Sequence, residues 1–155
     1  MGENDESSTT RSEAIRCLFE KPGIQVEVSS KIVDTLWSKL VSVGAIGTLM
    51  TAARASLPEI LASPYGEATV RMLMEEIVAV GQSQGVTFPP RCVDSKLEGA
   101  KAEADEFQSS LQYDLSIGKP RELDELPGAV VETAGEASLP VPASAERGRS
   151  RRGAG

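Results

Sequence analysis

Residues 31–54 read KIVDTLWSKLVSVGAIGTLMTAAR, and this stretch decides the fold. In its first half, apolar residues recur at the three- and four-residue spacing of a helix, at Ile32, Val33, Leu36, Trp37, Leu40 and Val41. From Val43 to Ala53 almost every residue is apolar or small. A helix that is apolar on all sides is a buried one. The sequence therefore predicts one long central helix from about Lys31 to about Arg54.

Further helices are expected on both sides of this stretch. Amphipathic spacing predicts them at residues 12–20, 65–84, 91–105 and 122–137. One helical turn is expected between Leu57-Pro58 and Ser63-Pro64. Before the central helix, Ile24, Val26 and Val28 alternate with polar residues, which is the period of a half-buried strand. No other segment has the pattern of a neighbouring strand. The sequence predicts a mainly α fold with one helix-strand piece at its front.

Charge is distributed unevenly along the chain. The 155 residues carry a formal charge of −7, although the last segment, 143–155, holds four arginines against one glutamate. The remainder is therefore more acidic still, and an acidic body repels phosphate backbones. We expect no nucleic-acid binding by the fold. The segment 143–155 is expected to be a disordered, solvated basic tail because it has few apolar residues to bury.

The rarest residues exclude several classes of site. The chain has no histidine, and its two cysteines, Cys17 and Cys92, lie far apart. This rules out the common zinc patterns and every histidine-based nucleophile. Both cysteines are expected to be small core residues. With no run of 18 apolar residues and no basic-then-apolar start, neither a membrane span nor a secretory signal is expected. A cytoplasmic setting is the default expectation.

Three positions are candidates for chemistry, and each has a structural alternative. Lys39 is the one cation inside the long apolar stretch, and it either extends to the surface or is held inward for a reaction. Glu122 stands at a predicted helix start, where a carboxylate complements the helix dipole. Ser110, in the pair Ser109-Ser110, either caps a helix or binds a ligand. Composition and spacing alone lead no further than a helical domain.

Four motifs fall in order along the chain. They are WSKL from Trp37, MEEIVAV from Met74, SSLQYD from Ser109, and GKPRELD from Gly118 followed by GAVV from Gly128. Their order and distances resemble the signatures of ketopantoate reductases (2-dehydropantoate 2-reductases). The resemblance covers about residues 23–142.

The resemblance implies a fold and a reaction. The fold would be the helical carboxy-terminal domain of these reductases, which is similar to that of 6-phosphogluconate dehydrogenase. The reaction would be NADPH-dependent reduction of a small 2-oxo acid, in the pathway to pantothenate. Lys39 aligns with the catalytic lysine of the family, Ser110 with a serine that binds the substrate, and Glu122 with a glutamate that orients substrate and lysine.

The sequence also departs from the family pattern. Val43 and Gly47 stand where typical members have asparagines, which leaves the identity of the 2-oxo acid open. The amino-terminal GxGxxG turn that would hold NADPH is missing. We therefore expect residues 1–29 to be the remnant of the end of a nucleotide-binding domain and residues 30–142 to be the helical domain. Such a chain is expected to be a fragment that is inactive alone.

A second class of function competes with this one. The chain would then be a non-catalytic helical interaction module from a truncated reductase gene. It would associate with itself or with a nucleotide-domain partner through the face that the lost domain once covered. The missing GxGxxG favours this alternative, whereas Lys39, Ser110 and Glu122 favour catalysis.

Overall fold

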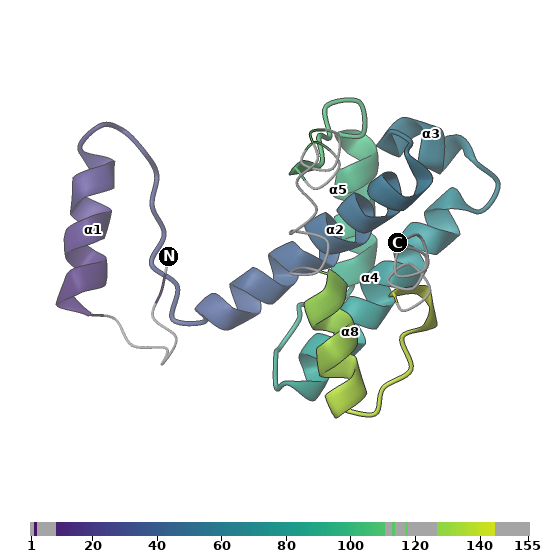
Figure 1. Ribbon diagram of the computed structural model, residues 1–155. Helices are drawn as coiled ribbons and strands as arrows, with labels where there is room; N and C mark the ends of the chain where they lie inside the picture. Colours follow the sequence, from purple (N-terminus) through teal and green to yellow (C-terminus); the bar gives the residue numbers. More distant parts are fainter. Residues whose placement is uncertain (1, 3–8, 111–112, 114–116, 118–126, 145–155) are drawn as a thin grey trace. The chain divides into compact units, whose positions relative to one another are not determined.

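The structure is a computed structural model that describes residues 2, 9–110, 113, 117 and 127–144. The chain divides into two compact units, Met1–Trp37 and Ser38–Gly155. In the described residues every regular element is helical (Figure 1). The predicted mainly α fold is confirmed.

The first unit contains helix α1, Thr10–Glu20, close to the predicted range. A capping box fixes its start: the Thr9 hydroxyl accepts a hydrogen bond from the Ser12 amide at 3.1 Å, and the Ser12 hydroxyl accepts one from the Thr9 amide at 3.0 Å. At the other end Gly23 adopts φ +84°, the left-handed conformation that glycine tolerates. Cys17 on this helix is exposed, so its prediction as a core residue was wrong.

The predicted strand at residues 24–28 was also wrong. These residues belong to no regular element, and Ile24 is half exposed. A strand exists only when a neighbour pairs with its backbone, and no described residue supplies that neighbour. The alternation of apolar and polar residues is present, but the pairing that it requires is not.

Helix α2 runs from Ile32 to Ala53, in agreement with the predicted central helix. Nine of its residues, from Val41 onward, are buried. Arg54, with φ 52°, follows the helix, and the Ala55 amide donates to the Met50 carbonyl at 3.2 Å. By length and composition α2 is apolar enough to cross a membrane, but half of the relevant window is buried inside the fold. A core helix passes the same test, so this is weak evidence for a span.

In the second unit, α4, Gly66–Ser83, is the central helix, and it contacts α3, α5 and α8 (Figure 1). Its apolar stripe is fully or almost fully buried at Val70, Leu73, Met74, Ile77 and Val80. Gly85, with φ +83°, follows the helix in the left-handed conformation that glycine tolerates.

The short helix α3, Leu57–Ala62, precedes α4, and Ser56 is its N-cap. The Glu59 carboxylate accepts hydrogen bonds from the amide and the hydroxyl of Ser56, both at 2.7 Å. The connection to α4 is tight, because a β-carbon on Gly66 would overlap with the carbonyl oxygen of Ile60. Glycine is therefore required at the point where α4 begins.

Helix α5, Cys92–Ala102, is joined to α4 by two ion pairs at opposite ends. Arg71 pairs with Asp94 at 2.7 Å, and Lys101 pairs with Glu67 at 2.6 Å. The side chains are only partly exposed, between 37% and 47%, and the pairs fix the register of the two helices more than they stabilise them.

Helix α8, Pro127–Glu136, buries Val130 and Ala134 in the core. Proline is the first residue of this helix, a position where its missing N–H costs nothing. The segment expected to be a disordered tail does not start at residue 143, because Ala143 and Ser144 lie in a helical turn. The rest of that segment, 145–155, lies outside the described residues.

Candidate functional site

Lys39 lies in α2 just before the buried half of that helix, and its side chain is exposed. No described carboxylate lies within ion-pair distance of its ammonium group. This exposure is compatible with the apolar stretch around Lys39, because a lysine can place its stem along a helix surface and its charge in water. Of the two alternatives that the sequence left open, the structure shows the first: Lys39 extends to the surface and is not held inward. In this position its ammonium is accessible to a ligand.

Ser109 and Ser110 divide the two roles that the sequence left open. The Ser109 carbonyl accepts a hydrogen bond from the Tyr113 amide at 3.0 Å, so Ser109 occupies the cap position of a helical turn. Ser109 is buried, whereas Ser110 is exposed and is the first helical residue. The hydroxyl of Ser110 makes no hydrogen bond to a described residue, and so it can bind a ligand.

The third predicted residue, Glu122, lies outside the described residues. In the described part of the chain no hydrogen bond joins Lys39 to Ser110. The convergence of Lys39, Ser110 and Glu122 on one substrate therefore stays a prediction.

Sequence reasoning missed Glu76, the one buried carboxylate among the described residues. Its two oxygens accept hydrogen bonds from the amides of Ala143 and Ser144, both at 2.8 Å, and from the Ser144 hydroxyl at 2.6 Å. The available signal was an acid in the apolar stripe of α4, between Met74 and Ile77. Glu76 holds the carboxy-terminal segment against α4 and has no free oxygen for a ligand.

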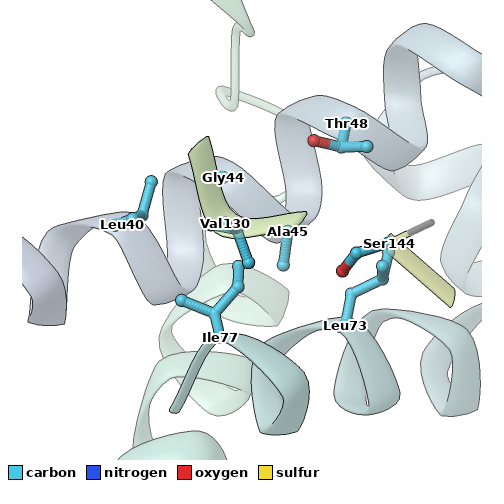
Figure 2. Close-up of a pocket in the computed structure, with 8 residues that line it drawn as sticks. All are labelled: Leu40, Gly44, Ala45, Thr48, Leu73, Ile77, Val130 and Ser144. Carbon is cyan, nitrogen blue, oxygen red and sulfur yellow. The ribbon is translucent and has the colours of Figure 1, made fainter. Parts of the chain in front are cut away.

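A small cavity lies inside the second unit between α2, α4 and α8 (Figure 2). The residues that line it are mostly apolar: Leu40, Gly44, Ala45, Thr48, Leu73, Ile77, Val130 and Ser144. Its volume is only about 10 Å³, which is the space of about one water molecule. It is a gap in the core and cannot hold a substrate.

A larger and open groove of about 410 Å³ lies between α4 and the start of α5. It is lined by charged residues of both signs, among them Arg71, Glu75 and Asp94. Hydrogen bonds from Arg71 first, and then from Arg91, hold the pKa of Asp94 below its ordinary value. The charges thus satisfy one another, and neither Lys39 nor Ser110 lies in this groove.

The described residues do not fit a dinucleotide cofactor. Its pyrophosphate is usually held where a strand meets a helix through a glycine-rich turn, and no described residue lies in a strand. Nor do the described residues form a group of three or more acidic or cysteine side chains placed to hold a metal ion. What the described residues offer is an accessible ammonium and an accessible hydroxyl.

Comparison with known proteins identifies the family of this helical domain. A model of the family described as ketopantoate reductase PanE/ApbA C terminal matches residues 31–145. The 2-dehydropantoate 2-reductase of Mesorhizobium japonicum is 34% identical over 140 residues, which are 88% of this chain and 42% of that protein.

Two solved structures have the same fold. The PanE/ApbA family ketopantoate reductase from Ralstonia eutropha JMP134 is 28% identical with a TM-score of 0.81, over 90% of this chain and 46% of that one. The dimeric ketopantoate reductase from Staphylococcus aureus is 22% identical with a TM-score of 0.82, over 91% and 49% of the two chains. The chain thus spans less than half the length of these relatives.

Proposed function

Because the chain belongs to the PanE/ApbA ketopantoate reductase family and matches its carboxy-terminal domain, we propose that it forms the substrate-binding part of a 2-oxo acid reductase. Residues 30–142 would be this helical domain, and residues 1–29 would correspond to the end of the nucleotide-binding domain. The reaction of the whole protein would convert a 2-oxo acid into a 2-hydroxy acid in the cytoplasm, as in pantothenate synthesis.

The observation that carries the proposal is the match of residues 31–145 to the carboxy-terminal domain of the family. Within this domain Lys39 is the proposed acid; its side chain is exposed on α2 and has no described carboxylate partner. Reduction of a ketone places negative charge on the carbonyl oxygen, and a hydrogen bond from an ammonium stabilises that charge as it develops. Lys39 would then donate its proton to the same oxygen, which completes the hydroxyl group of the product.

Two further residues would position the 2-oxo acid substrate. The exposed Ser110 hydroxyl would donate a hydrogen bond to the substrate, and Glu122 would orient the substrate and Lys39. NADPH is the cofactor expected for the whole reductase, but the described residues do not fit it. Its binding is therefore assigned to the part of the relatives that this chain does not cover, and Lys39, Ser110 and Glu122 act on the 2-oxo acid.

An interaction module remains the second candidate, and one observation favours it. In the first unit several large apolar side chains are exposed, among them Leu18 at 64%, Leu36 at 57% and Ile24 at 50%. Such side chains would mark an interface where they form one contiguous patch. The partner would be a nucleotide-binding domain or a second copy of the chain.

Catalysis is tested by joining the chain to the amino-terminal half of the Mesorhizobium japonicum reductase and following NADPH oxidation with 2-oxo acids. Lys39→Ala should lower kcat by about 10²- to 10⁴-fold, the usual effect of removing a general acid. Lys31→Ala, another exposed lysine next to the same helix, is the control and should leave kcat unchanged. Equal turnover by the Lys39→Ala protein would refute the proposed role. Ser110→Ala and Glu122→Ala should weaken both turnover and substrate binding.

A further inference from the structure

We draw no further inference here: the strongest candidate, the open groove of about 410 Å³ between α4 and the start of α5, is lined by Arg71 and Asp94, which pair with each other, and nothing in the structure shows what would occupy it.

Discussion

The carboxylate of Glu76 in α4 binds Ser144 twice, accepting hydrogen bonds from its amide at 2.8 Å and from its hydroxyl at 2.6 Å. The two residues are 68 positions apart in the chain, and both are at least nine-tenths buried. A buried carboxylate is stable only when its oxygens are hydrogen-bonded. This contact therefore fixes the end of the described chain to the centre of the core.

Replacing Glu76 by glutamine should destabilise the fold. The amide nitrogen of glutamine donates where one carboxylate oxygen accepts. Even with the remaining oxygen facing Ser144, the Ala143 amide loses its partner, and the other two hydrogen bonds are no longer made to a charged group. Hydrogen bonds to charged groups contribute about 1.5–3 kcal/mol each, and we expect a loss of at least that size in the free energy of unfolding. Urea denaturation measures it. Glu75→Gln, at the exposed neighbouring position, is the matched control and should stay within about 0.5 kcal/mol of the wild type.

Substitutions of two helical glycines should have opposite effects. In Gly66→Ala the new methyl group would overlap with the backbone of Ile60, which cannot move without shifting α3. Overpacking of this kind costs about 1–3 kcal/mol. In Gly99→Ala, inside α5, the methyl group meets no atom within 4 Å. This variant should gain about 0.5–1 kcal/mol because alanine is the better helix former. Thermal unfolding of the two proteins measures the expected loss and the expected gain in stability. A Gly66→Ala protein as stable as the wild type would show that the connection between α3 and α4 can relax.

The helices could be predicted from sequence because the apolar spacing that indicates a helix lies within the helical segment itself. The apolar spacing of residues 31–54 and 65–84 places the ends of α2 and α4 within a few residues of those observed. The strand expected at residues 24–28 has a local pattern too, but a strand depends on a partner that a single segment cannot reveal.

The candidate site was predictable only in part, for the same reason. Lys39 and Ser110 were found by their place in family motifs, and the structure adds that both are accessible. Glu76 was missed because its partners, Ala143 and Ser144, follow it by 67 and 68 residues. The place of Glu76 in an apolar stripe indicates burial, but nothing near it in sequence indicates which groups bind its charge.

Stability should depend on Asp94 in acid. Its pKa is held below the ordinary value by the hydrogen bond from Arg71 and then by that from Arg91. A carboxylate with a lowered folded-state pKa stabilises the fold above its unfolded pKa of about 3.9, and this contribution is lost as the pH falls through the folded-state value. Asp94→Asn should therefore have a lower Tm than the wild type at neutral pH, and the difference should shrink below about pH 4.

The control for this variant is Asp105→Asn. Asp105 is exposed and makes no ion pair with a described residue. The Tm of the Asp105→Asn protein should therefore follow that of the wild type at every pH. A difference between Asp94→Asn and the wild type that is constant with pH would mean that the ion pair with Arg71 does not contribute.

The two cysteines should react with iodoacetamide at very different rates. Cys17 is exposed on α1, whereas Cys92, the first residue of α5, is 8% exposed, and burial raises the pKa of its thiol. The thiolate is the reactive form, so Cys92 is protected both by access and by its smaller thiolate fraction. Mass spectrometry should show one rapid modification at Cys17 and a second, slow one at Cys92. In a Cys17→Ser variant only the slow reaction should remain, and urea should accelerate it. Rapid modification of Cys92 in the native protein would mean that the amino-terminal end of α5 opens, and with it the ion pair between Asp94 and Arg71.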